Sequence, residues 1–282
     1  MTKHIPVLLG DVMAALGDVR GMRIIDATFG AGGYTRAFLD AGADVTAFDR
    51  DPHVADDAAA VANEYGARFT FIPQPFSAMA DLTGEYDAIV FDLGISSMQI
   101  DIADRGFSFR ADGPLDMRMS GNGASAADLI ANTDVAELAR ILRDYGDIKK
   151  APALARAIRD ARPRTTMELR DLIYNPRDIA PVFQALRIAV NDEMGEVQRA
   201  LAAVPKLLRA GGKCICVTFH SLEDRIVKNT FRAWTTAPGD PRMPVVAAAP
   251  FSAIAPKTPS AAELAQNPRA RSAHMRGVIK SY

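Results

Sequence analysis

Cysteine is scarce in this sequence, which has two among its 282 residues, Cys214 and Cys216. Their spacing places both thiols on one face of a strand within an apolar run, which predicts buried packing rather than a metal site or a disulfide. Long uncharged apolar runs are absent, so no membrane-spanning segment is expected. Residues 1–6 lack the pattern of a signal peptide, and we therefore expect a cytoplasmic protein with no membrane partner and no metal site.

An excess of charge of one sign is also absent from the chain as a whole, which carries 33 lysines and arginines, 34 acids and a net charge of −1. This balance argues against nucleic-acid binding over the whole surface. Two stretches differ: residues 139–177 hold ten lysines or arginines against five acids, and the last fourteen residues hold four against none. Such stretches are either solvated helix faces or phosphate contacts for a large polyanion, and the sequence leaves both open.

The first third of the chain alternates apolar strand-like runs with helical segments. Hydrophobic residues make up 49% of the sequence, which is enough for a sizeable core. The alternation predicts an α/β fold with a Rossmann-like, doubly wound parallel sheet. The expected strands are 22–28, 44–49, 68–72 and 86–93, and the expected helices between them are 34–41, 52–65 and 76–82.

The pattern changes after residue 94. Residues 95–124 have no clear period, which is typical of functional or disordered stretches when it occurs inside a compact protein. Helical patterns at 126–131, 135–145, 151–161 and 167–174 then predict an inserted helical domain. A long helix at 184–208 leads back to a strand at 213–219, and residues 247–255 are expected to form a loop or hairpin.

These patterns divide the chain into three parts. Residues 1–105 are the first part of the core, which we expect to bind a nucleoside ligand. Residues 106–190 form an inserted loop and helical domain, which we expect to recognise the substrate. Residues 191–282 complete the core and end in the basic tail.

The first predicted strand ends in a glycine-rich turn formed by Gly30, Gly32 and Gly33, and a helix-compatible segment follows it. Glycines let a ligand approach the backbone, and the helix N-terminus presents free N–H groups to it. Because the spacing is not G-x-G-x-x-G, the turn suits a ligand without a pyrophosphate, such as S-adenosylmethionine (SAM). Asp49, at the end of the next strand, can bind both hydroxyls of a ribose.

Two further polar side chains stand at predicted strand ends. Asp92 ends the fourth strand, where its carboxylate can accept hydrogen bonds from the SAM ammonium or a substrate amine, or can cap the following turn. His220 ends the strand at 213–219 and is either a site residue or a structural histidine. The next residue, Ser221, fits a helix N-cap with Asp224 in the capping-box position, and no nucleophile elbow of a hydrolase is present.

The segment 105–110 holds two phenylalanines, Phe107 and Phe109, between two arginines, Arg105 and Arg110. Such side chains stack on bases and pair with phosphates. The alternative is that the two rings fill the space under a long loop, and the segment by itself does not decide between the two.

Together the motifs resemble the bacterial small-subunit ribosomal RNA cytosine-N4 methyltransferases, known as the MraW family. The matching blocks follow the family order from residue 4 to about residue 276, and several are long and unusual. They are His4–Leu9, Asp26–Gly33, Asp49–Pro52, Asp92–Ser97, Arg105–Phe109, Pro114–Met119, Phe183–Ile188, Phe219–Arg225 and Asn267–Ala273.

The resemblance implies a SAM-dependent enzyme that methylates N4 of one cytidine in the decoding region of 16S ribosomal RNA. Its partner would be that RNA or the assembled 30S particle, and a homodimer is left open. The implied cofactor contacts are Gly32, Gly33, Tyr34, Asp49, Phe76, Asp92 and Gln99, and the candidate catalytic residues are Asp92, for positioning, and His220. The candidate substrate contacts are Phe107, Phe109, Asp116, Arg118 and Arg187, with the two phenylalanines as our candidates for a clamp on the base.

The chain departs from the family pattern at two places. The family usually has histidine where this chain has Tyr34, and it tends to carry Pro-Ala-Thr-Arg-Thr where this chain has residues 177–182, with Pro181 in place of an arginine. Two other functions stay open, and the changed segment 177–182 keeps the second of them open. One is a SAM methyltransferase that acts on a protein or a small molecule, and the other is a non-catalytic RNA-binding factor in ribosome assembly.

Overall fold

The computed structural model describes residues 6–237 and 248–282. The chain divides into two compact units, here called unit 1 (residues 1–94 and 194–282) and unit 2 (residues 95–193). The sequence pattern places the divisions at 105 and 190, and the roles expected for the parts stay predictions. The motif residues His4 and Ile5 and the first residue of the expected hairpin, Ala247, lie outside the described residues.

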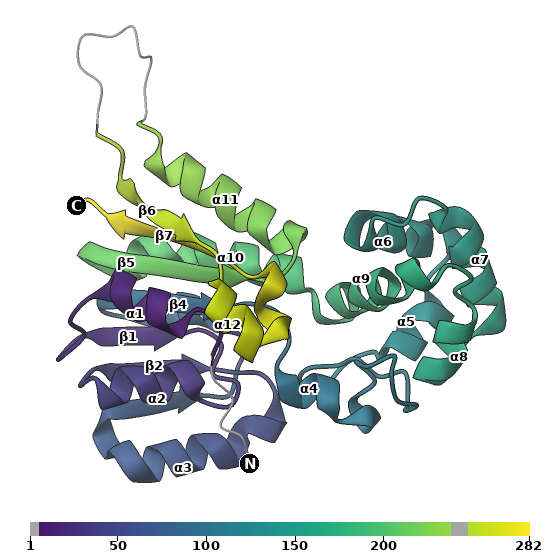
Figure 1. The fold of residues 1–282 in the computed structure, drawn as a ribbon, viewed down its shortest axis with the longest axis horizontal. Coiled ribbons are helices and arrows are strands. Elements are labelled where there is room, and N and C mark those ends of the chain that lie inside the picture. Colours follow the sequence, from purple (N-terminus) through teal and green to yellow (C-terminus); the bar gives the residue numbers. More distant parts are fainter. Residues whose placement is uncertain (1–5, 238–247) are drawn as a thin grey trace, which may run out of the picture. The chain divides into compact units, whose positions relative to one another are not determined.

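Unit 1 is built on a seven-stranded sheet with the strand order β3-β2-β1-β4-β5-β7-β6 (Figure 1). Strands β1 to β5 pair in parallel, and β7 runs antiparallel to both of its neighbours. The strands are β1 (Arg23–Asp26), β2 (Asp44–Phe48), β3 (Phe69–Ile72), β4 (Tyr86–Asp92), β5 (Leu208–Thr218), β6 (Phe251–Lys257) and β7 (His274–Lys280). The predicted α/β, doubly wound sheet is confirmed, and all five expected strands are present.

The sequence predicts a loop or hairpin for most of β6 and no strand for β7. Residues 251–257 contain alanine, serine and proline, which have low β-propensity, and the tail was interpreted only by its charge. Both segments become strands because β7 pairs with β5 on one side and with β6 on the other. The purely parallel sheet is therefore wrong for this edge, and tertiary pairing has overridden local propensity.

Helices flank this sheet on both faces, as the doubly wound pattern requires (Figure 1). The longer ones are α1 (Leu9–Leu16), α2 (Gly33–Asp40), α3 (Ala55–Tyr65), α10 (Glu193–Leu207), α11 (Ser221–Thr235) and α12 (Ala261–Gln266). The 3-10 helices are η1 (Pro52–Val54), η2 (Gly66–Arg68), η3 (Phe76–Asp81) and η6 (Pro268–Ser272). None of the helices in the described ranges is long and apolar enough to cross a membrane.

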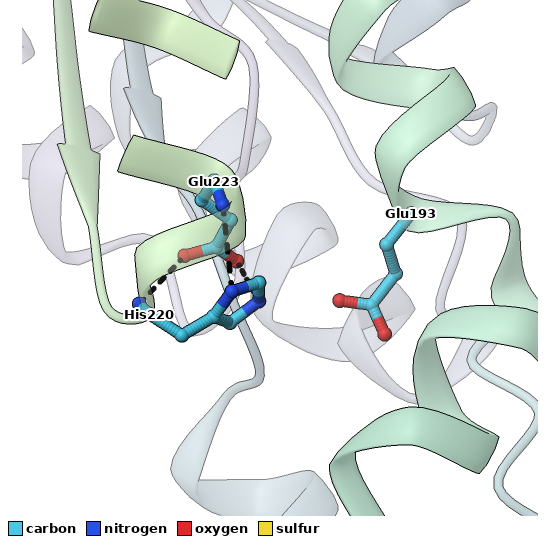
Figure 2. Close-up of side chains that lie close together, drawn as sticks. All are labelled: Glu193, His220 and Glu223. Carbon is cyan, nitrogen blue, oxygen red and sulfur yellow. Dashed lines mark hydrogen bonds and ion pairs between the residues drawn. The ribbon is translucent and has the colours of Figure 1, made fainter. Parts of the chain in front are cut away.

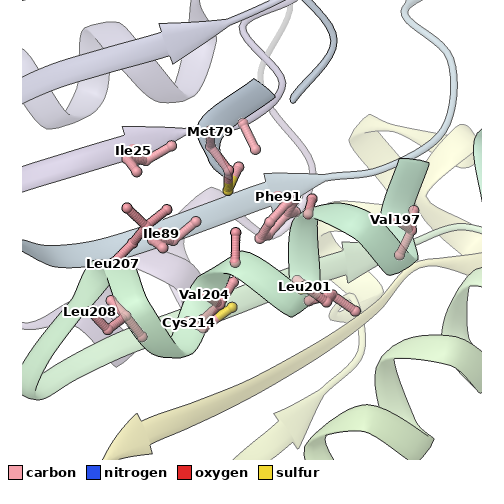
Figure 3. Packing of buried hydrophobic residues seen from close by; sticks show 14 of the residues in the cluster. Ile25, Met79, Ile89, Phe91, Val197, Leu201, Val204, Leu207, Leu208 and Cys214 are labelled. Atoms are coloured by element: carbon pink, nitrogen blue, oxygen red, sulfur yellow. The ribbon is translucent and has the colours of Figure 1, made fainter. Parts of the chain in front are cut away.

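The core of unit 1 lies between the central strands and α10 (Figure 3). Ile89 and Phe91 of β4 meet Leu201 and Val204 of α10 in one fully buried cluster. Cys214 belongs to the same cluster, and both it and Cys216 are free and buried, so the prediction of apolar packing is confirmed. Burial also raises the pKa of the Cys216 thiol, which keeps it in the neutral form.

Unit 2 is helical and has a hydrophobic core of its own. Capping boxes start three of its helices, with Ser96 paired to Gln99, Ser125 to Asp128 and Thr165 to Glu168. Its helices are α4 (Ser97–Asp101), α5 (Ala126–Asn132), α6 (Val135–Gly146), α7 (Ala151–Ala161), α8 (Thr166–Asp171) and α9 (Ile179–Asn191), with 3-10 helices η4 (Ala103–Arg105) and η5 (Pro176–Asp178).

The expected long helix over 184–208 is interrupted. Asp192 adopts a left-handed conformation with φ 48° and ends α9, and α10 begins at the next residue. The side chain of Asn191, the last residue of α9, donates to the carbonyl of Met117 at 2.7 Å and accepts from the Met119 amide at 2.8 Å. These bonds to the 106–124 loop compete with helix continuation, and they explain why one apolar periodic stretch forms two helices.

Candidate active site

Three aspartates stand at the carboxyl ends of neighbouring strands. Asp26 ends β1, Asp49 directly follows β2, and Asp92 ends β4, and these strands lie side by side in the sheet. In open α/β sheets, ligands bind outside this edge of the strands. The expected pair of carboxylates is therefore present, together with a third, Asp26, that the sequence pattern did not predict as a site residue.

Asp49 holds the glycine turn in place. One carboxylate oxygen accepts from the Gly30 amide at 2.8 Å, and the other accepts from the Asp51 amide at 2.9 Å. Burial is the main cause that raises the pKa of Asp49. Each oxygen keeps a second lone pair after these bonds, so the side chain can still accept from the hydroxyls of a ribose.

The glycine turn has the left-handed backbone expected of it, with φ 53° at Gly30 and 76° at Gly32. At Gly33, however, the chain itself occupies the space beside the backbone, because a Cβ atom there would lie 2.4 Å from the Pro6 ring. The absence of a side chain at Gly33 thus makes room for the N-terminal segment. The expected ligand-binding role of this glycine stays a prediction.

Two hydrogen bonds fasten this N-terminal segment, residues 6–8. The hydroxyl of Tyr34 donates to the carbonyl of Val7, and the amide of Leu8 donates to Glu263 Oε1 of α12 at 2.6 Å. Tyr34 is buried, and burial together with Asp92 and Asp26 raises the pKa of its phenol. The side chain that replaces the family's histidine is thus bound to the protein's own backbone, beside the carboxylates.

Asp92 has an unusual environment for a carboxylate. Its Oδ1 is buried and has no hydrogen-bond partner among the described residues. Its own amide donates to Thr28 Oγ1 at 2.7 Å, which ties the end of β4 to the loop after β1. Burial first, and then the charges of Asp26 and Glu223, raise the pKa of Asp92 well above its usual value. An orphaned buried acceptor of this kind is satisfied when a ligand supplies the donor.

Asp26 is the aspartate that sequence reasoning missed as a site residue. It is fully buried, and its carboxylate accepts from Thr35 Oγ1 at 2.6 Å and from the Thr28 amide at 3.1 Å. Burial raises its pKa to about 6 in spite of these bonds. The available signal was its position, because it ends its strand as Asp92 does.

His220 caps α11, and Figure 2 shows its ring beside the Glu223 carboxylate. Its Nδ1 accepts from the Glu223 amide at 3.4 Å, and its Nε2 lies 3.0 Å from Glu223 Oε1. Glu223 Oε2 accepts from the amides of Phe219 and His220 at 2.8 and 3.2 Å. The expected cap at Ser221 with Asp224 is therefore wrong by one residue. Glu193, also drawn in Figure 2, belongs to unit 2, where it pairs with Arg187.

Phe76, the first residue of η3, packs edge to face on Phe91 with 5.8 Å between the ring centroids. It is half-buried against the sheet, so part of its ring is accessible. This position beside the strand ends suits an apolar contact to a flat ligand, and its role as an adenine contact stays a prediction.

The remaining candidates lie in unit 2, where most are bound to neighbouring groups. Gln99 forms a capping box with Ser96. Phe107 is 6% exposed and has the Arg105 guanidinium 5.6 Å from its ring centroid, whereas the half-buried Phe109 packs on Phe183. Two ion pairs hold the last three candidates: Asp116 with Arg118 at 2.6 Å, and Arg187 with Glu193 at 2.7 and 2.9 Å.

Unit 1 thus brings together six of the expected cofactor residues at one edge of its sheet: Gly32, Gly33, Tyr34, Asp49, Phe76 and Asp92. The free acceptor of Asp92 and the remaining lone pairs of Asp49 fit a cationic ligand that also carries ribose hydroxyls. SAM has both features. The residues present therefore fit this cofactor.

The family model described as the MraW methylase family matches residues 1–281. Ribosomal RNA small subunit methyltransferase H of Chelativorans sp. (strain BNC1) is 48% identical over 296 residues, covering 99% of this chain and 87% of that protein. The protein of the same name from Rhizorhabdus wittichii is 45% identical over 295 residues, covering 97% and 92%.

Among solved structures, magnesium protoporphyrin IX methyltransferase from Synechocystis PCC 6803 with bound SAM resembles this chain with a TM-score of 0.44 at 13% identity. The match covers 97% of this chain and 78% of that one. The family assignment rests on the sequence match over the whole chain instead. The chain belongs to the MraW methylase family.

Proposed function

We propose that this protein transfers a methyl group from SAM to N4 of a cytidine in the decoding region of 16S ribosomal RNA. The names of the relatives support ribosomal RNA of the small subunit as the substrate. The cytidine and its N4 come from the motif resemblance. The observation that carries the chemistry is Asp92 at the end of β4, with its buried and unsatisfied Oδ1.

The cytosine amine is a poor nucleophile because its lone pair is delocalised into the ring. An enzyme must therefore hold the amine in line with the methyl donor and accept hydrogen bonds from its N–H groups as positive charge develops. Positioning alone can lower such a barrier by about 7 kcal/mol or more. Asp92 Oδ1 can supply the acceptor, either to the amine or to the ammonium group of the cofactor.

The residues of unit 1 divide the work of holding the cofactor. Asp49 would bind the ribose, Phe76 the adenine, and the backbone of Gly32, Gly33 and Tyr34 would line the turn. Bound SAM supplies a methyl group on a positively charged sulfur, which makes that methyl electrophilic. We assign no base to the reaction, because a methylated ammonium-like cytosine is a strong acid and solvent can take its proton.

The target base must leave the stacked RNA to reach such a site. Phe109 is the better candidate for an aromatic contact to the base, because Phe107 is buried under the Arg105 guanidinium. Gln99 is proposed on the cofactor side, and Asp116, Arg118 and Arg187 are proposed on the RNA side. The ion pair between Asp116 and Arg118, and the ion pair between Arg187 and Glu193, would then orient these side chains for the RNA.

The test is methylation of purified small subunits and of naked 16S RNA with labelled SAM, followed by nucleoside mass spectrometry. We expect N4-methylcytidine at a single position with at least one of the two substrates. Transfer only to a protein extract would assign the alternative substrate class. SAM binding by calorimetry without transfer to any of these would assign the non-catalytic assembly factor.

The role of Asp92 is tested by Asp92→Asn, which keeps the shape of the side chain but removes its charge. We expect weaker SAM binding and loss of transfer. The control is Asp81→Asn, the same change at an exposed position of η3. Equal SAM affinity and equal turnover in the two variants would exclude Asp92 from the site.

A further inference from the structure

Helix α11 presents a row of cations on its exposed side. Arg225, Lys228 and Arg232 are three and four residues apart, so they lie on one face of the helix, and all three are exposed. The opposite face carries Val227 and Phe231, which are buried. No side-chain hydrogen bond or ion pair holds any of the three cations in the part of the chain that the structure describes.

A hollow of about 220 Å³ lies near the start of this row, at the end of the β6–β7 pair. Lys257 of β6 and His274 and Arg276 of β7 line it. Lys257 and His274 are exposed, and Lys257 pairs with Met275, so its side chain lies on the sheet face opposite that of His274 and Arg276. The side chains of His274 and Arg276 share one face of β7 and bring positive charge to the hollow on that face.

Asp224 joins the hollow to the helix. Both its oxygens accept from the Arg276 guanidinium, at 2.7 and 2.9 Å, and it precedes Arg225 by one residue and Lys228 by one helical turn. Arg276 first, and then His274 and Lys228, lower the pKa of Asp224. His274 and Arg276 at the hollow and Lys228 of the α11 row thus face the same carboxylate, and the cations around it and along the helix are here called the α11 surface. It consists of Arg225, Lys228, Arg232, His274 and Arg276.

Positive charge on the α11 surface exceeds negative charge. Four lysines or arginines stand against the single carboxylate of Asp224, because Glu223 is buried under the start of the helix. Elsewhere the basic stretches found in the sequence are partly neutralised. Of the ten cations in residues 139–177, Arg140, Arg143 and Arg170 pair with acids of the same stretch. In the tail, Lys280 donates to the carbonyls of Pro205 and Leu208.

We propose that the α11 surface binds the phosphodiester backbone of the RNA substrate. The proposal rests on the proposed function, since it takes its ligand to be RNA. Flexible exposed arginines and lysines at one-turn spacing contact successive phosphates, and such contacts position a nucleic acid without reading its sequence. The hollow takes one further phosphate beside His274 and Arg276. The surface lies wholly in unit 1, so it would hold RNA beside the sheet that carries the candidate site.

The test is a variant that loses three of these cations, R225Q/K228Q/R232Q. Binding of a fluorescent 16S RNA fragment is measured by anisotropy over a series of salt concentrations. Each lost phosphate contact lowers the slope of log affinity against log salt by about 0.7–0.9. We expect the slope to fall by about two in total, with weaker binding at every salt concentration and unchanged SAM affinity.

A matched control removes three exposed cations from other elements of unit 1, R20Q/K206Q/R209Q. Arg20 and Arg209 pair with exposed or partly exposed acids, and such surface pairs contribute little to stability. The control changes the net charge by the same amount as the α11 variant. We expect its salt slope to equal that of the wild type.

An α11 variant that binds RNA with the wild-type slope and affinity would overturn the inference, and so would a wild type that binds no RNA. If the variant instead lost binding only to phosphatidylglycerol vesicles, the surface would belong to a membrane contact and the inference would fail. Methyl transfer is scored separately. A wild type that binds RNA through α11 but methylates none would leave this inference standing and would refute the proposed function.

Discussion

The hydroxyl of Thr35 donates a 2.6 Å hydrogen bond to the buried carboxylate of Asp26. This bond joins the first turn of α2 to the end of β1, and it spans the glycine turn between them. Burial nevertheless raises the pKa of Asp26 to about 6 from 3.8. The carboxylate is therefore held in a place where its charged form is costly, which is common at functional sites.

Stability should depend on pH through Asp26. A raised pKa means that the folded state binds the proton more tightly than the unfolded state, so its contribution is full below pH 3.8 and is lost as pH rises toward about 6. The loss is about 3 kcal/mol, because one pKa unit corresponds to about 1.4 kcal/mol. Asp26→Asn should remove this part of the pH dependence, and urea unfolding across this range measures it.

The same acid-to-amide change at the exposed Asp44 is the control. It should keep the wild-type pH dependence. Asp49 and Asp92 also have raised pKa values, so the Asp26→Asn protein should retain a smaller dependence of the same sign. Identical pH profiles for the wild type and Asp26→Asn would show that Asp26 does not titrate in this range.

Most of unit 1 could be predicted from the sequence because its strands are short apolar runs that alternate with helical segments and end at glycine, proline or aspartate. The sequence pattern did not predict the structure where contacts with distant segments of the chain determine it. Residues 251–257 have little strand propensity and become β6 only through pairing with β7. The break at Asp192 depends on bonds from Asn191 to a loop that lies more than seventy residues earlier in the chain. No local pattern contains that information.

The candidate site, too, could be predicted from the sequence only in part. Strand ends predicted the positions of Asp49 and Asp92, because parallel strands end at one edge. What the sequence could not show is which side chains are already bound to the protein. The Tyr34 hydroxyl meets the Val7 carbonyl, and Asp224 meets Arg276 rather than capping α11. These contacts join segments that are distant in sequence, and composition carries no trace of them.

Tyr34→Phe should loosen the N-terminal segment. It removes the hydroxyl that donates to the Val7 carbonyl and leaves the ring in place. A hydrogen bond of this kind contributes about 1 kcal/mol, so we expect SAM affinity to fall about fivefold with little change in turnover at saturating SAM. Hydrogen exchange at the Leu8 amide, which donates to Glu263, should become faster.

Tyr65→Phe is the matched control, because the Tyr65 hydroxyl bonds to Asp40 on an exposed surface. It should change neither SAM affinity nor exchange at Leu8. If Tyr34→Phe also left both quantities unchanged, the N-terminal segment would have no part in holding the cofactor.

Arg187 and Glu193 should stabilise unit 2 as a pair. Their side chains are 11% and 8% exposed, and two hydrogen bonds join them. Removing one partner from a buried pair leaves the other charge unsatisfied and costs about 3 kcal/mol or more. Arg187→Met and Glu193→Gln should therefore lower the urea midpoint by similar amounts, and the double variant R187M/E193M should recover much of the loss.

RNA binding separates this structural role from the proposed substrate contact. If Arg187 contacts RNA, Arg187→Met should weaken RNA binding more than Glu193→Gln does at equal stability. Equal RNA affinities in the two variants would remove Arg187 from the set of substrate residues.

Phe107 and Phe109 should respond differently to loss of the aromatic ring. Phe107 is 6% exposed in the core of unit 2, so Phe107→Ala should cost about 3 kcal/mol or more of stability. Leucine keeps most of the apolar volume and removes only the ring. Phe107→Leu should therefore nearly keep both stability and methyl transfer, whereas Phe109→Leu should keep stability and SAM binding but lose transfer if the Phe109 ring stacks on the target base. Urea unfolding, calorimetry with SAM and transfer to the small subunit measure the three effects. Normal transfer by Phe109→Leu would show that both rings serve only in core packing. The contact to the base would then have to come from another part of the chain.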